Sequence, residues 1–169
     1  DDEVRNNIKN KYSIFKEVIV KSTFPSKIDI KVEEYKFIAK NKKTDGQIEI
    51  IMENGKTYNG EVRNNYNLPI LENFKEDEDK LKEVYKNLLE LKQEVLIQIS
   101  EIISEDDGNL TIYMNDGQKI KVSRTNFSQK LNYYDEISKY IDDKKNTTLN
   151  LINGAYLETS KSEKQRIQN

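Results

Sequence analysis

The residues best suited to binding a metal are the polar run Asp106-Asp107-Gly108-Asn109. Clustered carboxylate and amide oxygens are typical calcium ligands, and an EF-hand loop also requires a glutamate at its twelfth position. Counted from Asp107, that position holds Gln118, which lacks the carboxylate. Because Asp, Gly and Asn are also the residues that turn a chain between two strands, we favour a hairpin turn over a calcium site.

Two other charged runs have simpler structural explanations. The run Glu76-Asp77-Glu78-Asp79 could attract a cation, but carboxylates also stabilise the first turn of a helix, where they face the positive end of its dipole. We expect the helical explanation to hold. The run Asp142-Asp143-Lys144-Lys145 is typical of a solvated helix end.

Histidine and cysteine are both absent from the 169 residues. This excludes imidazole bases, Ser-His pairs, thiol nucleophiles, disulfides and zinc sites built from thiolate or imidazole. The sequence also contains no glycine-rich phosphate loop and no nucleophile elbow. We therefore predict no catalytic residue, no metal and no cofactor. The alternative of an enzyme would require clustered carboxylates with raised pKa values.

Charge and hydropathy narrow the class of protein further. The chain carries 28 Lys and Arg against 30 Asp and Glu, a balance that argues against a nucleic-acid binder with a basic face. No run approaches the roughly 18 apolar residues that a membrane span requires. The length suits one domain or one and a half. Because the sequence begins at Asp1 rather than Met, we interpret it as a piece of a longer protein.

The first elements are predicted from apolar spacing. Val4, Ile8 and Tyr12 recur every four residues, which indicates a short helix over 3–13. Apolar and polar residues then alternate on both sides of Pro25 and predict a hairpin. In its second strand Ile28, Ile30 and Val32 alternate with charged residues, so we expect that strand to be half-buried.

The rest of the chain predicts an α+β fold, with an antiparallel β-sheet covered on one face by two packed helices. The composition changes near residue 36. We therefore place a small unit in 1–35, a second domain in 36–159 and a polar, disordered tail in 160–169. The expected elements of the second domain are a hairpin at 48–58 around Asn54-Gly55, a helix over 76–96, a three-stranded meander over 97–122, a helix from Asn126 to about Asp143 and a final strand over 147–152.

The end of the last strand is the best candidate for a binding surface. Tyr156 follows Gly154-Ala155 near the chain end, and a terminal strand with small and aromatic residues suits an exposed sheet edge. Such an edge can recruit a partner strand through its main-chain groups. A Tyr156 that packs back on the core is an equal alternative. The expected partner-binding residues are Thr148, Asn150, Ile152, Asn153, Gly154, Ala155 and Tyr156.

The order of several weak motifs resembles the extracytoplasmic part of the bacterial cell-division protein family FtsQ/DivIB. The segment from Phe24 to Glu34 is similar to the closing hairpin of the family's POTRA domain, and Phe37-Ile38-Ala39 to its step into the second domain. Tyr35, Phe37, Ser123 and Asn150 depart from the usual residues. Further matches are Gly55–Tyr58, Leu68–Leu71, Ile99–Ile102, Leu110–Val122, Lys130-Leu131 and the ending Leu149–Leu157.

The resemblance implies a non-catalytic divisome scaffold that acts in septum formation. Residues 1–35 would be the C-terminal half of a POTRA domain and 36–159 the family's β domain. The full-length protein would be a single-pass protein on the extracytoplasmic side of the cell membrane, at the division site. Its implied partners are the coiled-coil membrane proteins FtsB/DivIC and FtsL, which add a strand to the C-terminal edge. No nucleic acid and no small-molecule substrate is expected.

A different extracytoplasmic binding module, such as a solute-binding lipoprotein or an adhesin fragment, is the main alternative. It would require a pocket lined by convergent polar groups.

Overall fold

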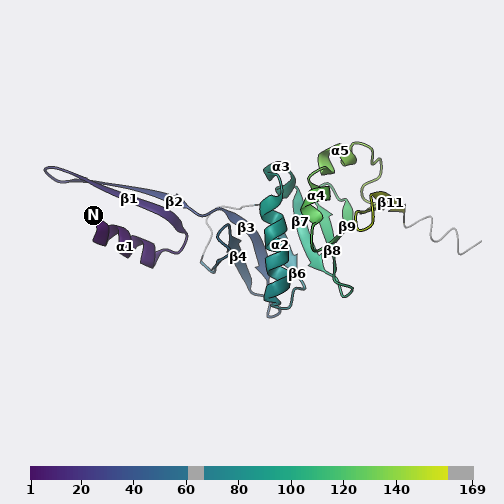
Figure 1. Cartoon of the computed structure of the whole chain (residues 1–169), viewed down its shortest axis with the longest axis horizontal. Coiled ribbons are helices and arrows are strands. Elements are labelled where there is room, and N and C mark those ends of the chain that lie inside the picture. The colour runs from purple at the N-terminus through teal and green to yellow at the C-terminus, as the bar shows by residue number, and fades with distance from the viewer. Residues whose placement is uncertain (61–66, 160–169) are drawn as a thin grey trace, which may run out of the picture.

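The computed structural model describes residues 1–60 and 67–159, which form two β-sheets joined between Glu34 and Phe37 (Figure 1). The first sheet has two strands and the second has nine. The predicted tail over 160–169 lies outside the described residues. The interpretation of residues 1–35 as half of a POTRA domain stays a prediction.

The first sheet is a long hairpin accompanied by one helix. Helix α1 (Asp2–Lys11) precedes β1 (Phe15–Thr23), which pairs antiparallel with β2 (Lys27–Glu34). The predicted helix and hairpin are therefore confirmed. Figure 1 shows the hairpin extending away from the large sheet. Helix α1 packs against β1, in which Val18 is buried.

The prediction that the second strand of this hairpin is half-buried is wrong. Ile28, Ile30 and Val32 are 60 %, 49 % and 48 % exposed. All three share a face with Val18 and Val20, because Val18 pairs with Val32 and Val20 with Ile30. Since α1 packs against β1, the half of that face contributed by β2 remains exposed.

The nine-stranded sheet follows the spatial order β11-β10-β9-β8-β7-β6-β3-β4-β5. The predicted α+β class is confirmed, as are the hairpin around Asn54-Gly55 and the meander, which begins at Ile99 rather than 97. Gly55 has a positive φ of 79°, which suits the turn between β4 and β5. The strands are β3 (Phe37–Lys42), β4 (Ile48–Met52), β5 (Thr57–Tyr58), β6 (Ile70–Glu72), β7 (Ile99–Ser104), β8 (Asn109–Met114), β9 (Lys119–Ser123), β10 (Thr147–Asn150) and β11 (Tyr156–Thr159).

The sheet is mixed rather than purely antiparallel, contrary to expectation. Strand β6 was not predicted, and it lies parallel to both β3 and β7 in the middle of the sheet. Strand β10 is parallel to β9. The physical reason is the connection between neighbours: helices separate β6 from β7 and β9 from β10, and a helical crossover returns the chain in the same direction.

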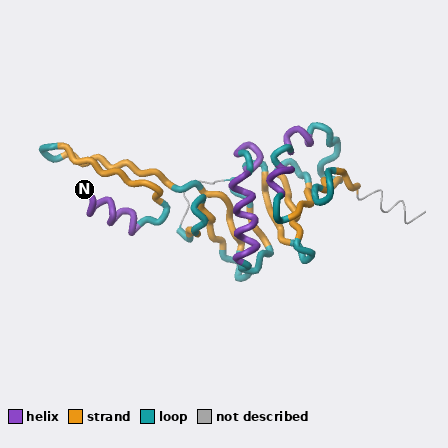
Figure 2. Tube along the Cα trace, viewed as in Figure 1, coloured by secondary structure: helices purple, strands orange, loops and turns teal. Residues whose placement is uncertain are grey.

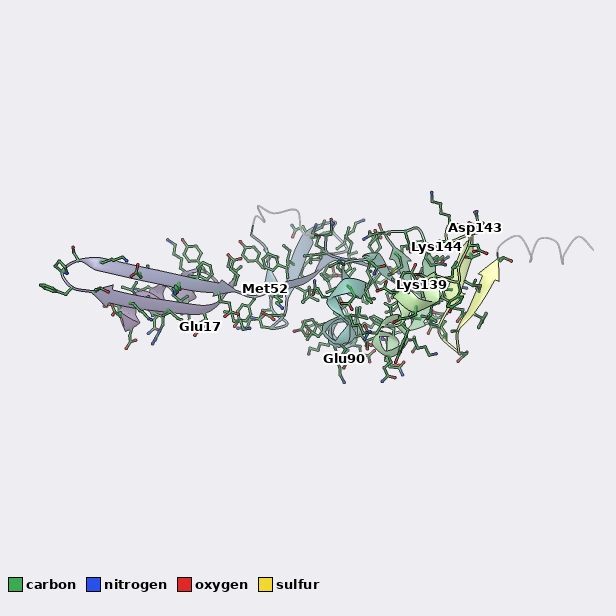
Figure 3. All side chains as sticks on the ribbon, turned by 90° about the horizontal axis from the view of Figure 1, so that it is seen from above. Glu17, Met52, Glu90, Lys139, Asp143 and Lys144 are labelled. Carbon is green, nitrogen blue, oxygen red and sulfur yellow. The ribbon has the colours of Figure 1, made fainter. Side chains whose placement is uncertain are left out.

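Four helical segments cover one face of this sheet (Figures 2 and 3). They are α2 (Glu78–Glu90), α3 (Gln93–Leu96), α4 (Phe127–Leu131) and α5 (Tyr134–Ser138). The two helices predicted over 76–96 and from Asn126 to Asp143 are thus each broken once. Asn132 explains the first break, because its side chain accepts from Lys92 N (2.8 Å) and donates to Glu90 O (3.1 Å) between α2 and α3. These bonds replace main-chain helical hydrogen bonds that are missing at the end of α2 and at the start of α3.

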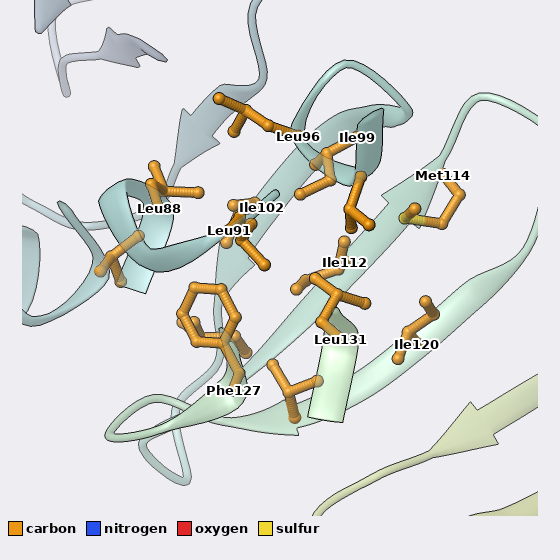
Figure 4. Packing of buried hydrophobic residues seen from close by; sticks show 14 of the residues in the cluster. Leu88, Leu91, Leu96, Ile99, Ile102, Ile112, Met114, Ile120, Phe127 and Leu131 are labelled. Atoms are coloured by element: carbon orange, nitrogen blue, oxygen red, sulfur yellow. The ribbon is translucent and has the colours of Figure 1, made fainter. Parts of the chain in front are cut away.

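The core lies between these helices and the sheet. Figure 4 shows Leu88 from α2, Leu91 directly after that helix, and Leu131 from α4, directed at strand residues such as Ile102 and Ile112. All five side chains are buried, so the apolar side of the helix predicted over 76–96 faces the sheet. Asn126 begins α4 as predicted, but its side chain makes no capping bond.

Candidate partner-binding edge

The acidic runs are engaged in turns and helix ends. Asp107 accepts from Asn109 N (2.9 Å) and Asn109 Nδ2 (3.1 Å) in the turn between β7 and β8, and these bonds lower the pKa of its carboxyl. The predicted hairpin turn is confirmed. Asp77 caps α2 by accepting from Lys80 N (3.2 Å), with Glu78 in the first turn, as the helical explanation required. Among the described residues, no three metal-ligating side chains come together.

Some of the tyrosine side chains are packed and hydrogen-bonded, and others are exposed to solvent. The hydroxyl of Tyr134 donates to Asp116 Oδ2 (2.6 Å), and burial raises its pKa. The hydroxyl of Tyr85 donates to Glu53 O. Tyr140, in contrast, is 86 % exposed, because α5 ends at Ser138 and does not continue to it.

The sheet edge lies one strand later than the sequence indicated. Strand β10 was expected to be the last, but it is flanked by β9 and by the additional strand β11. Thr148 and Asn150 are therefore internal, while Tyr156 begins the edge strand and is 50 % exposed. The remaining predicted residues, Ile152, Asn153, Gly154 and Ala155, form the connection between β10 and β11.

A short turn produces the additional strand. Asn150 Oδ1 accepts from Ile152 N (3.0 Å), and Gly154 adopts a positive φ of 97°. An Asx turn followed by a left-handed glycine reverses the chain. The missed signals were Asn153-Gly154, a common hairpin turn, and the alternation of apolar and polar residues after it.

The direction of the main-chain groups in β11 follows from its neighbours. Leu151 N donates to Lys121 O of β9 (2.8 Å). Successive residues of a strand direct their peptide groups to opposite sides. Thr148 and Asn150 therefore direct theirs away from β9 and toward β11. Their antiparallel pairs are Glu158 and Tyr156, whose peptide groups therefore face β10. Leu157, between them, directs its N–H and C=O to the outer edge of the sheet.

An apolar hollow of about 280 Å³ adjoins this edge on the side covered by helices. The side chain of Leu157 points to that side, because Leu157 pairs with the core residue Leu149. Tyr140 and Leu157, the latter 43 % exposed, leave apolar surface open to solvent here. The residues that line the hollow are Glu136, Ile137, Tyr140, Ile141, Leu149, Ala155, Tyr156 and Leu157.

Polar side chains hold β11 from the opposite side. Glu158 Oε1 accepts from Asn150 Nδ2 (2.9 Å), and Glu158 Oε2 pairs with Lys121 Nζ (3.2 Å). The bond from Asn150 and the charge of Lys121 lower the pKa of the Glu158 carboxyl. The periodicity of the sequence identified neither Lys121 nor Glu158 as a residue of this edge. Glu158 lies 37 positions from Lys121 and 8 positions from Asn150 along the chain.

Within the described residues, no helix has the length and apolarity needed to cross a bilayer.

Comparisons with known proteins agree on one family. The sequence profile described as "Cell division protein FtsQ/DivIB, C-terminal" matches residues 41–159. The chain is similar to Cell division protein DivIB of Bacillus anthracis, with 36 % identity over 159 residues, or 89 % of this chain and 58 % of the relative. Similarity to DivIB of Bacillus subtilis strain 168 is 30 % over 149 residues, covering 86 % of this chain and 56 % of the relative.

The fold has a counterpart among solved structures. The major extracytoplasmic domain of the trans isomer of DivIB from Geobacillus stearothermophilus aligns with a TM-score of 0.52 and 27 % identity. The alignment covers 65 % of this chain and 96 % of that domain. The chain spans less than two thirds of the length of the Bacillus relatives. Profile, relatives and fold together place it in the FtsQ/DivIB family of bacterial cell-division proteins.

Proposed function

We propose that this chain is part of a non-catalytic divisome scaffold that binds a partner by strand addition at β11. The observation that carries the proposal is the outward direction of the Leu157 peptide group at the end of the nine-stranded sheet. A partner strand placed there would gain main-chain hydrogen bonds that need no particular side chain. Selectivity would then come from the side chains on either face.

The apolar hollow supplies that selectivity. A partner residue opposite Leu157 would direct its side chain to the same face as Leu157, toward Ile137 and Tyr140. An apolar side chain bound there would shield from water the apolar surface that is exposed in the free protein. Tyr156, half-exposed on the other face, is a suitable aromatic anchor.

The family supplies the expected partners and location. In keeping with the resemblance, the partners are the FtsB/DivIC-type and FtsL-type coiled-coil membrane proteins, and the site of action is the septum. Residues 1–35 would belong to a POTRA domain, and the full-length protein would be anchored by a single span with this part on the extracytoplasmic side. The engagement of Asp107 and Asp77 in turns and caps supports a role without catalysis.

The test uses proline at Leu157. Because this N–H faces outward, Leu157→Pro removes a donor that β10 does not use, and proline is tolerated at such edge positions. We expect the folded variant to lose at least about tenfold in affinity, or about 1.4 kcal/mol, for the extracytoplasmic segment of the DivIC-type protein from the same organism. Tyr156→Ala should cost about 1–3 kcal/mol of binding free energy if this ring is an anchor.

Two controls complete the titration. Leu157→Ala keeps the N–H and loses only side-chain contacts, so it should bind more tightly than Leu157→Pro. Lys82→Ala, on the exposed side of α2, should bind as the parent does. Circular dichroism confirms folding. Unchanged affinity of a folded Leu157→Pro variant would refute strand addition at β11.

A further inference from the structure

Strand β11 is held mainly by polar contacts. None of its four residues is buried, and within residues 1–60 and 67–159 it pairs with β10 alone. Strands with little buried surface open locally at low free energy. An edge strand that opens easily presents its outer peptide groups for only part of the time, so whatever fastens β11 also controls the binding surface.

The first fastening is a lysine on α4. Lys130 Nζ donates to Leu151 O (2.8 Å) and lies 3.3 Å from Gly154 O, so one ammonium group joins both ends of the turn between β10 and β11. The helix that carries it is fixed, because its residues Phe127 and Leu131 are buried in the core. Lys130 therefore connects the turn to a rigid element.

The second fastening is Glu158 within β11 itself. Its two carboxylate oxygens contact Asn150 on β10 and Lys121 on β9, so a single side chain spans three strands. The carboxylate is partly exposed, with 34 % of the side chain open to solvent. The substitution Glu158→Gln keeps the size of the side chain, so it removes the charge without leaving a void.

We propose that Lys130 and Glu158 are positioning residues of the partner site. They hold the turn and β11 in register, so that the Leu157 peptide group stays presented at the sheet edge. This inference rests on the proposed strand addition at β11. Neither residue needs to touch the partner, and both act by raising the fraction of molecules whose edge is ready to bind.

The experiment combines partner titration with amide hydrogen exchange on the complete chain. Lys130→Met keeps the length of the side chain and removes its charge and donors. We expect about tenfold weaker binding, which corresponds to about 1.4 kcal/mol. Exchange should accelerate at the amides of Tyr156 and Glu158, which face β10, and stay unchanged at Ile112 in the centre of the sheet. Lys86→Met, an exposed lysine on α2, is the matched control and should change neither.

A charge exchange separates positioning from general loss of stability. Glu158→Gln should weaken binding and accelerate exchange in β11, even if Lys130→Met also lowers global stability. Lys121→Glu alone should do the same. The double variant Lys121→Glu, Glu158→Lys restores an ion pair with reversed sign but not the bond from Asn150. It should therefore recover part of the slow exchange and part of the affinity, relative to either single variant.

The outcomes are distinct. If Leu157→Pro abolishes binding but Lys130→Met and Glu158→Gln bind as the parent does, positioning is overturned and strand addition stands. If exchange in β11 is unchanged in both variants, positioning is overturned whatever the affinities. If Leu157→Pro binds normally, strand addition itself is wrong and the inference fails with it.

Discussion

Replacing Asn87 should destabilise the fold more than any pattern in the sequence suggests. This side chain is 2 % exposed in the middle of α2. Its amide nitrogen donates to Glu83 O (3.0 Å), Arg124 O (3.3 Å) and Thr125 O (3.2 Å), and its oxygen accepts from Ser128 N (3.0 Å). One amide therefore connects α2 to the segment that enters α4.

The expected cost follows from what would be left unpaired. In Asn87→Ala, the buried N–H of Ser128 loses its acceptor, which costs about 1–3 kcal/mol. The carbonyls of Arg124 and Thr125 lie nearer to solvent and can be hydrated, so their lost bonds add about 1 kcal/mol at most. We expect a loss of about 1–4 kcal/mol in the free energy of unfolding, measured by urea titration with circular dichroism.

A second variant tests the reasoning by pH. Asn87→Asp keeps an acceptor for Ser128 N–H but directs a carboxylate oxygen at the carbonyls of Arg124 and Thr125. Burial and these carbonyls should raise the pKa of the introduced carboxyl in the folded state. Stability relative to the parent should then improve as the pH falls through that pKa, because the protonated group can donate again. A loss below about 0.5 kcal/mol for Asn87→Ala, or no pH dependence for Asn87→Asp, would refute the assigned network.

Three further outcomes are expected. Leu88→Ala should cost about 2–5 kcal/mol of unfolding free energy, whereas Leu89→Ala on the exposed side should cost less than about 0.5, and equal losses would contradict the assigned core face. Tyr134→Phe removes a hydrogen bond to an exposed carboxylate at the β8–β9 turn and should cost about 1.5 kcal/mol in the same assay. Hydrogen bonds from the side chain and backbone of Thr44 lower the pKa of Glu76 below its ordinary 4.5, so their contribution to stability is complete above pH 4.5 and is lost as the pH falls through the folded value. Thr44→Val should raise this pKa in an NMR titration, and an unchanged value would contradict the assignment.

Much of the local structure could be predicted from the sequence. Alternation around Pro25 indicated the hairpin, and a three-stranded meander was expected over 97–122. Both are present. The helix expected over 76–96 is present as α2 and α3, and its apolar side packs on the sheet. These features depend on neighbours two to four positions apart, and such neighbours are visible in a linear sequence.

The interruptions of the helices could not be predicted in the same way. The break after Glu90 depends on the side chain of Asn132, which lies more than 40 positions from it. The short strand β6 has only three residues and gains its hydrogen bonds from β3 and β7 on either side. No local pattern specifies those partners.

The candidate site shows the same division. Composition alone excluded histidine and cysteine chemistry, and the position of Tyr156 after Gly154 indicated a strand edge near the chain end. Which strand is outermost, and that Leu157 rather than Ile152 presents its peptide group there, was decided by the tertiary structure. The physical reason is that a peptide group's direction depends on which neighbour takes its hydrogen bond, and here that neighbour is set by the pairing of β10 with β9.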